Sequence, residues 1–423
     1  MSRYQRYPAY RDSGVEWIGE IPGHWEVKQT RHIFKIFSGS TPKSGEELYW
    51  DGDITWFTPD DLGNNQQKNI SESRRKITEE GYKSCGTSLA KKNSIVFSTR
   101  APIGHIALST VPACCNQGCR ILEPENGNTD YWYYTLVSAK PVLQSLGQGS
   151  TFMELPRQSL ASFNLPCPSL EEQQAIACFL ERKTAEIDEL ITKKEELLKK
   201  LDEKRSALIT RAVTKGLAPS APMKESGVEW LGKIPNHWDI AALHHITILK
   251  SGESIIATMM DENEEFPVYG GNGFRGYFSN YTHNGDYILI GRQGALCGNI
   301  NYASGKFWAS EHAIVLTPTQ TIISTWLGEL LKAMNLNQYS VSAAQPGLSA
   351  EVIGRLKIPL PPLDEQQAIA EHIEKKTATI DRQKAQVTEA IERLKEYRSA
   401  LITDTVTGKM DVHSIGKKES LST

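Results

Sequence analysis

Two stretches of the chain, starting near residues 171 and 364, place apolar residues at the spacing of long helices. With Leu180 at heptad position a, positions a and d of the two stretches give the predicted core of a helix pair: Leu180, Ile187, Leu190, Leu197, Leu201, Leu208, Ile373, Ile380, Val387, Leu394 and Leu401. Each pattern runs for about 40 residues, or roughly 60 Å of helix. Gly216 and Gly408 suit the two helix ends.

A helix with so narrow an apolar seam needs a partner, because an isolated helix gains little stability without tertiary packing. We expect the two helices to pair with each other in antiparallel orientation, as elements related by a two-fold axis do. Two alternatives stay open, in which each seam packs on its own domain or on a second chain.

The segments outside the helices have the patterns of mixed α/β domains. Short β-branched runs bounded by turn residues predict strands at NSIVFSTR, HIALST, YILIGR and AIVLTP. Helical apolar spacing predicts helices at DYWYYTLVSAKPVLQSL and STWLGELLKAMNLNQY.

The chain is a tandem duplication. SGVEWIGEIPGHW at 13–25 returns as SGVEWLGKIPNHW at 226–238, and EEQQAIACFLERKTAEID at 171–188 returns as DEQQAIAEHIEKKTATID at 364–381. KRSALITRAVTKG at 204–216 also returns, as YRSALITDTVTGK at 397–409. Between these frames, residues 31–170 and 244–363 agree poorly, and the second insert is shorter by 20 residues. Because Trp side chains need pockets, the repeated 13-residue segment predicts two equivalent pockets.

The predicted fold class is α+β, with two globular mixed α/β domains related by pseudo-two-fold symmetry and joined by two long antiparallel coiled-coil helices. The predicted boundaries follow the repeats: an N-terminal segment at 1–30, a first domain at 31–167, a first helix at 168–216, a linker with the repeated segment at 217–243, a second domain at 244–360, a second helix at 361–409 and a flexible tail at 410–423.

Composition narrows the class of protein. A chain of 423 residues suits two or three domains, and no run approaches the eighteen apolar residues of a membrane span. The start of the chain lacks the apolar core of a signal peptide, so we expect a cytoplasmic protein without membrane contact. The seven cysteines are odd in number and lack CxxC spacing, which suits a reducing compartment and argues against zinc.

Catalytic motifs are missing from the sequence. GGNGFRG at 270–276 contains GxGxxG but is followed by turn-like residues, so we interpret it as a surface loop. There is no phosphate-binding loop, no methyltransferase loop and no deaminase, hydrolase or zinc-protease motif, and Glu311 with His312 is more simply a strand-end pair. We expect neither catalytic residues nor a metal site.

Glycine-rich loops in the inserts carry Arg, amide and hydroxyl side chains, which can pair with base edges in DNA grooves. The loop with Arg100 and Gly104 and the loop with Arg292, Gln293 and Gly294 stand at similar places in the two copies. The candidate DNA-binding residues are Ser40, Thr41, Arg74, Arg75, Lys76, Arg100, Gln117, Ser150, Thr151, Asn272, Arg275, Arg292, Gln293 and Gln345.

As a set, these motifs resemble the specificity subunits of type I restriction-modification enzymes, and the resemblance covers nearly the whole chain. It rests on the paired SGVEW[IL]G[EK]IPxHW segments, the paired EQQAIA helix starts, the paired RSALIT helix ends, and the STRAPIG and YGGNGFRGY loops. The inserts vary by nature, so the resemblance assigns no individual base-reading residue.

The resemblance implies two target-recognition domains, each reading one half of a split site on double-stranded DNA, with the helices setting the spacing. It also implies two adenine methyltransferase subunits that use S-adenosylmethionine, and two restriction and translocase subunits that use ATP and Mg²⁺. This chain would then be a non-catalytic subunit without a cofactor of its own. The assembled complex would be an adenine-N6 DNA methyltransferase and an ATP-dependent endonuclease.

The charge of the chain is modest for a DNA-binding protein. The net charge is −3, and Lys plus Arg against Asp plus Glu is 14 against 13 in residues 31–170 and 7 against 9 in residues 244–363. Since phosphate neutralisation supplies most non-specific affinity, we expect the partner subunits to provide the remaining positive surface.

Two other classes of function compete with this one. A coiled-coil scaffold that never touches DNA would give no reason for Arg and amide loops or for divergent inserts in constant frames. A stand-alone enzyme would need a convergent set of acid, base or metal-binding residues, which the sequence does not offer.

Overall fold

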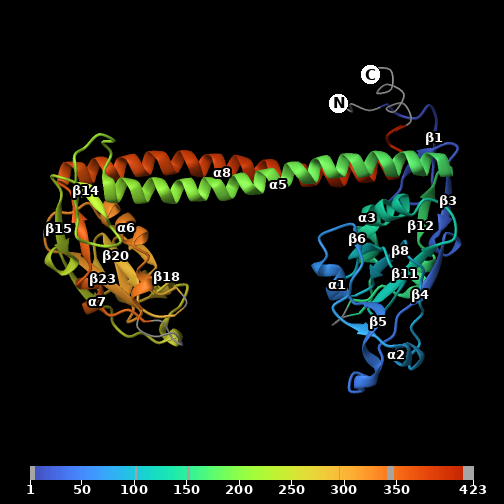
Figure 1. Cartoon of the computed structure of the whole chain (residues 1–423), viewed down its shortest axis with the longest axis horizontal. Helices are drawn as coiled ribbons and strands as arrows, with labels where there is room; N and C mark the ends of the chain where they lie inside the picture. Colours follow the sequence, from blue (N-terminus) through green and yellow to red (C-terminus); the bar gives the residue numbers. More distant parts are fainter. Residues whose placement is uncertain (1–4, 101, 150–152, 295, 341–346, 413–423) are drawn as a thin grey trace. The chain divides into compact units, whose positions relative to one another are not determined.

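The computed structural model describes residues 5–100, 102–149, 153–294, 296–340 and 347–412 (Figure 1). The chain divides into two compact units, the first comprising residues 1–193 and 390–423 and the second residues 194–389. Two long helices, α5 (Leu170–Lys215) and α8 (Leu363–Val406), each contribute a segment to each unit. Each unit therefore contains sheets and a segment of the helix pair.

The main sheet of the first unit has the order β4 (Phe34–Ser38), β11 (Cys119–Pro124), β8 (Ser94–Ser98), β9 (Ile106–Ser109) and β6 (Asn69–Ile70). A second sheet has the order β10 (Ala113–Cys115), β5 (Trp50–Phe57) and β7 (Lys76–Ile77). Two-stranded sheets pair β1 (Tyr10–Asp12) with β2 (Glu20–Pro22), and β3 (Glu26–Gln29) with β12 (Asn164–Cys167). The shorter helices are α1 (Pro59–Asn64), α2 (Glu79–Lys83), α3 (Thr129–Ser145) and α4 (Arg157–Ala161).

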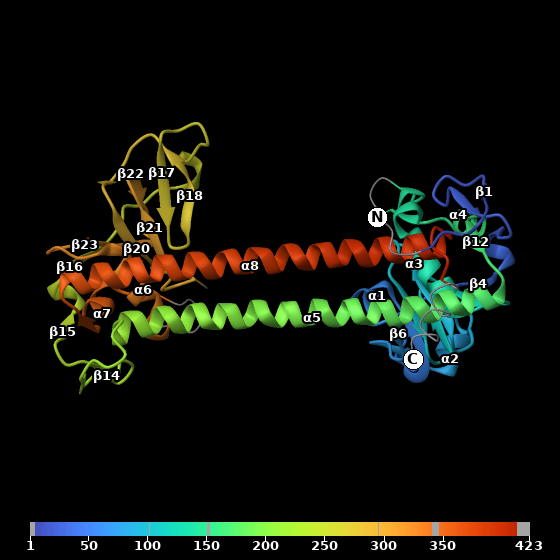
Figure 2. The same cartoon turned by 90° about the horizontal axis from the view of Figure 1, so that it is seen from above.

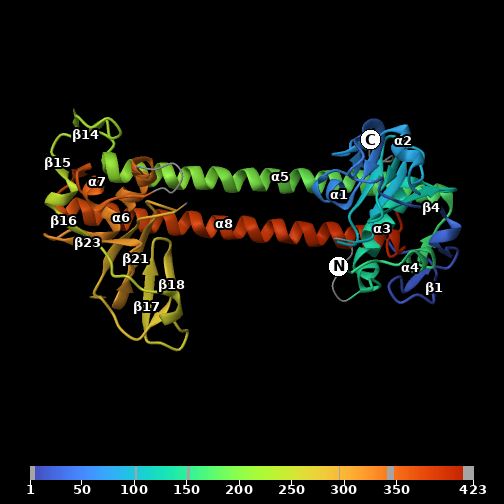
Figure 3. The same cartoon turned by 90° about the horizontal axis from the view of Figure 1, so that it is seen from below.

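The main sheet of the second unit has the order β16 (Thr247–Ser251), β23 (Ala313–Pro318), β20 (Tyr287–Gly291) and β21 (Ile300–Ala303). A second sheet has the order β18 (Gly273–Phe278), β17 (Phe266–Gly270), β22 (Lys306–Ala309) and β19 (His283–Asn284), and Figure 3 shows β17 beside β18. Two-stranded sheets pair β13 (Met223–Glu225) with β14 (Lys233–Pro235), and β15 (Asp239–Ala242) with β24 (Lys357–Leu360). The shorter helices are α6 (Ser324–Ala333) and α7 (Ala350–Gly354).

The two inserts share one strand topology although their letters agree poorly. The order β4-β11-β8-β9 of the first unit matches the order β16-β23-β20-β21 of the second. In each unit, the neighbouring sheet contains a parallel pair, β10 with β5 and β22 with β17. The mixed α/β domains that the sequence predicts are therefore confirmed, and so are the strands at SIVFS, IALS, YILIG and AIVLTP.

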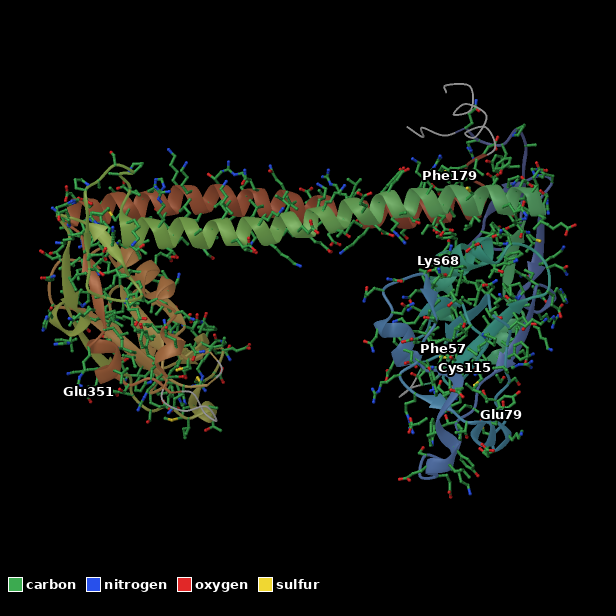
Figure 4. The ribbon with its side chains drawn as sticks, viewed as in Figure 1. Phe57, Lys68, Glu79, Cys115, Phe179 and Glu351 are labelled. Atoms are coloured by element: carbon green, nitrogen blue, oxygen red, sulfur yellow. The ribbon has the colours of Figure 1, made fainter. Side chains whose placement is uncertain are left out.

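Strand β8 separates two apolar cores in the first unit, because successive side chains of a strand point to opposite faces. Ile95 and Phe97 belong to the core shared with α3, whereas Val96 belongs to the core with Phe57 and Cys115. Phe57 and Cys115 lie close together in the interior of the domain (Figure 4). All five residues of β8 are buried, which explains its continuous apolar run.

Helix α3 attaches the first domain to both long helices. Within the first unit, the Tyr134 hydroxyl lies 3.2 Å from Thr184 Oγ1 of α5, and the Tyr131 hydroxyl donates to the Val406 carbonyl of α8 at 3.3 Å. Lys68 adds ion pairs to Asp130 of α3 at 2.6 Å and to Glu181 of α5 at 2.7 Å (Figure 4).

The two repeated segments occupy equivalent pockets, as the sequence predicts. In the first unit, the Trp25 indole donates to Glu172 Oε1 at 3.0 Å, and His24 Nε2 lies 2.8 Å from the same oxygen. Gly408, at the end of α8, has φ +73° and leaves room for Trp25, since a Cβ there would approach the ring to 3.1 Å. We call residues 13–25 with Glu172, Gly408 and Lys409 the first clasp.

The second clasp consists of residues 226–238 with Glu365, Lys215 and Gly216. The Trp238 indole donates to Glu365 Oε2 at 2.9 Å, and a Cβ on Gly216 would lie 3.1 Å from the Trp238 ring. In each clasp, a lysine at a helix end also donates to backbone carbonyls: Lys215 to Leu231 and Lys233, and Lys409 to Ile18 and Glu20. Each clasp thus joins the start of one long helix to the end of the other.

A buried glutamine next to each clasp carboxylate links the helix start to the adjoining domain. The Gln173 side chain accepts from the Asn128 backbone N–H, which precedes α3, at 2.9 Å. In the second unit, Gln366 accepts from the Ile323 backbone N–H, which precedes α6, at 3.1 Å. In each repeated Glu-Gln pair, the glutamate therefore binds the clasp and the glutamine binds the adjoining domain.

The helices α5 and α8 lie side by side in each unit (Figure 2) and run antiparallel, as predicted. Ion pairs set the register: Arg398–Asp188 (2.9 Å) in the first unit, and Arg205–Asp381 (3.5 Å) and Lys384–Asp202 (2.5 Å) in the second. In an antiparallel pair of helices, the numbers of two facing residues have a constant sum. That sum is 586 for all three ion pairs, so both units use the same register. Exposed ion pairs add little stability, and their effect here is to specify alignment.

The predicted seam differs from the observed one at two core positions. Leu190 and Leu197 were expected in the core at position d, but they are 48% and 42% exposed. The buried seam combines position a with position e, where Ile191 and Leu198 are half-buried. Because apolar residues stand at both d and e, the sequence is compatible with a seam of positions a and d and with a seam of positions a and e. The other predicted core residues are buried or half-buried: Leu180, Ile187, Leu201, Leu208, Ile373, Ile380, Val387, Leu394 and Leu401.

The seam assignment predicts different effects for two neighbouring leucines. We expect Leu201→Ala, at an 8% exposed position, to destabilise the isolated chain by about 2–4 kcal/mol because it opens a cavity between the helices. The matched control Leu197→Ala is expected to change stability by less than about 0.5 kcal/mol. Urea unfolding followed by circular dichroism measures both, and an equal loss in the two variants would contradict the a/e seam.

The first clasp predicts a pH-dependent stability. Burial alone would raise the pKa of Glu172, but hydrogen bonds from His24, Trp25 and Ser169 outweigh it and hold the pKa below the usual 4.5. Its contribution is therefore complete above pH 4.5 and is lost as the pH falls through the lowered pKa.

We expect Glu172→Gln to lower the melting temperature at pH 7 by about 4–8 °C, since it weakens buried hydrogen bonds to a charged group. The difference from the unaltered chain should shrink below pH 4.5. Glu171→Gln, at the exposed neighbouring position, is the control and should shift melting by less than about 2 °C. A deficit that stays constant from pH 7 to pH 3.5 would refute the assignment.

Candidate nucleic-acid interface

Three loops of the first domain meet at the ends of β4, β8 and β10. The Ser40 N–H donates to the Cys115 carbonyl at 3.0 Å, and the Thr41 hydroxyl donates to the Gln117 side chain. Gly39 makes this approach possible, because a Cβ at that position would fall 1.9 Å from the Asn116 carbonyl oxygen. The candidates Ser40, Thr41 and Gln117 are thus brought together.

A cavity of about 360 Å³ lies beside these loops and contains three of the candidate arginines. Its lining residues are Trp56, Thr58, Pro59, Asp60, Asp61, Arg74, Arg75, Arg100 and Asn116. The Arg75 guanidinium stacks over the Trp50 ring at 3.6 Å, and the Arg74 backbone N–H donates to Asp61 at 2.8 Å. These contacts hold residues 73–76 against β5 and α1.

The cavity is lined by more positive side chains than negative ones. Asp61 accepts from the Thr58 N–H and hydroxyl, at 2.8 and 2.6 Å, and so caps α1. Asp60 is exposed beside it. Three guanidinium groups against two carboxylates, one of them held in a cap, make the cavity suited to phosphate or to the acceptor edge of a base.

The second domain gathers a corresponding set of loops around the turn between β17 and β18. A Cβ on Gly271 would lie 2.9 Å from the His312 carbonyl oxygen, so this turn packs on the loop before β23. The Gln293 Oε1 lies 3.2 Å from His312 Nδ1, and the Asn299 amide donates to Asn272 at 3.3 Å. Asn272 and Gln293 are therefore close to one shared surface. GGNGFRG forms a strand hairpin here and opens no helix.

Several candidate residues do not join these groups. Lys76 pairs with Thr55 in the β5–β7 ladder and does not line the cavity. The Arg275 side chain folds over Gly270, where a Cβ would meet its Cδ at 2.4 Å. Ser150, Thr151 and Gln345 lie outside the described residues. All the DNA-binding assignments stay predictions.

Sequence reasoning missed three residues of these surfaces. Trp56 and Asn116 line the first cavity, and His312 contacts Gln293 in the second domain. Asn116 stands next to the candidate Gln117 in the sequence, so that candidate already marked the loop. Trp56 lies in β5, a strand that the sequence patterns did not predict.

The three cysteines near the first cavity are buried. Burial raises the pKa of the Cys114 thiol to about 12, and it also raises the pKa of Cys115 and of Cys119 well above the usual 9. These thiols stay neutral and pack as small apolar groups. Among the described residues, no group of His, Cys, Asp and Glu could hold a metal ion, and no helix has the length and apolar content of a membrane span.

Comparisons with known proteins agree on one family. The chain matches the type I restriction modification DNA specificity domain twice, over residues 22–200 and 235–393. It is 33% identical over 364 residues to the type I restriction enzyme EcoprrI specificity subunit of Escherichia coli, covering 81% of this chain and 85% of that one. It is 34% identical over 244 residues to the MjaIX specificity subunit of Methanocaldococcus jannaschii, covering 56% and 55% of the two chains.

Solved structures share the fold. A chain from a structure of type I restriction-modification complex assembly and conformational transition superposes with a TM-score of 0.71 at 15% identity, covering 91% of this chain and 98% of that one. The HsdS subunit of Thermoanaerobacter tengcongensis gives a TM-score of 0.55 at 16% identity, covering 92% and 98%. With two matching domains, a relative at 33% identity and the same fold, this chain belongs to the family of type I restriction-modification specificity subunits.

Proposed function

We propose that this chain selects the DNA site of a type I restriction-modification complex, with each insert domain reading one half of a bipartite sequence. The observation that carries the proposal is the contrast between frame and insert. Both clasps contain the same indole-to-carboxylate hydrogen bond, and the two domains share one strand order, but the loops at equivalent places hold different polar side chains. The repeated clasps suit two identical partner subunits. The divergent loops suit two different DNA sequences, one read by each domain.

The proposed partners are double-stranded DNA, two adenine methyltransferase subunits and two restriction and translocase subunits. Two identical methyltransferase subunits require two equivalent docking surfaces, and the duplicated clasps and helix ends supply them on one chain. S-adenosylmethionine, ATP and Mg²⁺ would belong to the partner subunits, and this chain would contribute no catalytic residue. The near-neutral domains fit this division, because partners that enclose the DNA would add the missing positive charge.

A scaffold that never touches DNA is the weaker alternative. It would give no reason for three arginines around one cavity in the first domain or for Gln293 and Asn272 at one surface in the second. It would also leave unexplained why the loops differ while the strand order is kept.

Exchange of one domain tests the proposed function. We expect a complex of this chain with its methyltransferase to methylate adenines in a bipartite sequence, which sequencing of methylated host DNA reveals. Replacing residues 31–170 by the corresponding insert of a relative should change one half of that sequence and leave the other half as it was. Exchange of residues 244–363 is the matched control and should change the opposite half. Methylation without a bipartite sequence, or a change in both halves after one exchange, would refute the proposal.

Helix length predicts the spacing between the half-sites. Four residues added to α5 between 196 and 197, and four to α8 between 389 and 390, lengthen the helices by about 6 Å and turn them by about 40° beyond a full turn. One base pair of DNA turns by about 35°, which matches the added rotation, whereas the added length is nearly two base-pair rises. Because the rotation decides which face of the DNA the second domain meets, we expect the spacer to grow by one base pair.

The control for this prediction separates length from rotation. Two residues added at each place lengthen the helices by about 3 Å, close to one base-pair rise, but turn them by about 200°. We expect no methylated bipartite sequence from this variant, although its subunits should still co-purify. An unchanged spacer in the four-residue variant would contradict the role of the helices in setting the distance.

A further inference from the structure

Backbone hydrogen bonds give the residue after Thr99 a defined place in the first domain. The Thr99 N–H donates to the Gly118 carbonyl at 2.8 Å, and the Thr99 carbonyl accepts from the Leu155 N–H at 2.8 Å. The following residue, Arg100, forms an isolated bridge with Glu154. Arg100 therefore stands one residue beyond a strand-like pairing at the end of β8.

The second domain repeats this pattern at Arg292. The Arg292 N–H donates to the His312 carbonyl at 2.9 Å, and the Arg292 carbonyl accepts from the Leu348 N–H at 2.9 Å. The following residue, Gln293, forms an isolated bridge with Gly347. By these contacts, Gln293 is the counterpart of Arg100, and Arg292 is the counterpart of Thr99. The two arginines that stand at similar places in the sequence thus do not correspond.

Arg100 is placed to reach a ligand at the cavity of the first domain. Its side chain is 34% exposed and lines the cavity beside Asn116. Its ion pair with Glu154 is loose, at 3.8 Å, and Glu154 is shared with Arg120 at 4.0 Å. A Cβ on Gly118 would lie 3.1 Å from Arg100 Nε, so the absence of a side chain there leaves the guanidinium its space.

Gln293 is exposed at the equivalent place, and a neighbouring imidazole orients its amide. His312 Nδ1 lies 3.2 Å from Gln293 Oε1, and His312 Nε2 lies 3.3 Å from Glu311. When the imidazole donates to Oε1, the amide group is held in one of its two flips. An amide with a fixed flip presents a defined donor and acceptor pair to a ligand.

We propose that Arg100 and Gln293 are specificity-determining residues that read one equivalent base pair in each half-site, with Arg100 selecting guanine and Gln293 selecting adenine. The chemistry is that of major-groove recognition: a guanidinium donates to O6 and N7 of guanine, and a carboxamide donates to N7 and accepts from N6 of adenine. The inference rests on the proposed function, since it names which residues of the two domains perform the reading.

The test uses the assembled complex of this chain with its methyltransferase. The bipartite sequence is first defined for the unaltered complex, and failure to find one refutes the proposed function itself. Affinities are then measured for a panel of duplexes that differ from that sequence by one base pair. Four variants are compared: Arg100→Ala, Arg100→Gln, Gln293→Ala, and the double variant of the two alanines.

We expect Arg100→Ala and Arg100→Gln to reduce discrimination at a single G·C pair of one half by roughly 5- to 150-fold, with the other half unaffected. Gln293→Ala should reduce discrimination to a similar degree at a single A·T pair of the other half. The double variant should show both effects. Arg157→Ala and Gln320→Ala, which alter exposed residues of the same types in the same domains, are the controls and should leave the whole panel unchanged.

Two outcomes overturn the inference while leaving the proposed function intact. One is an unchanged panel in Arg100→Ala or in Gln293→Ala. The other is a uniform loss of affinity for every duplex, which identifies a phosphate contact and not a base contact. Because Arg100→Gln keeps a polar side chain in the cavity, loss of the guanine preference in both Arg100 variants separates loss of reading from disturbance of the fold.

Discussion

A carboxylate at the start of each long helix makes the contact on which the tandem architecture depends. Glu172 and Glu365 each bind a tryptophan indole from a repeated segment, and the same indole packs on a glycine at the end of the other long helix. Because those glycines come from opposite copies, neither copy completes a clasp alone. The adjacent Gln173 and Gln366 then attach the domains. One pair of neighbouring side chains thus determines helix ends, helix pairing and domain attachment.

The division between constant and variable residues follows from what each contact requires. In the first clasp, the buried Glu172 needs its donors Trp25 and His24, since a buried charge without its donors is costly. In the domains, the strand order is held by backbone pairing and apolar burial, which many sequences satisfy. The exposed loops at the strand ends carry neither constraint. Their Arg, Gln and Asn residues are therefore free to differ between the copies without a loss of stability.

Sequence patterns predicted what is repeated or periodic and failed where chain segments meet only in space. The long helices and the equivalent pockets followed from repeated and periodic letters, and the strands followed from short β-branched runs. The helix seam did not, because Leu190 and Leu197 are followed by Ile191 and Leu198, and a shift of one position changes which pair is buried. The correspondence of Arg100 with Gln293 was also hidden. An arginine follows each strand, but at offsets that differ by one residue, and only the hydrogen-bonded register tells them apart.

The first clasp brings together segments that lie far apart in the sequence. Its parts come from opposite ends of the described chain: the Asp411 N–H donates to the Gln5 carbonyl at 2.9 Å, and the Tyr10 hydroxyl donates to the Gly408 carbonyl at 2.9 Å. In the second clasp, the equivalent parts are joined by continuous backbone between α5 and β13. Hydrogen bonds in the first clasp therefore take the place of the covalent backbone that joins the same parts in the second clasp. A gene that started at the second repeat would encode the same neighbours in circularly permuted order.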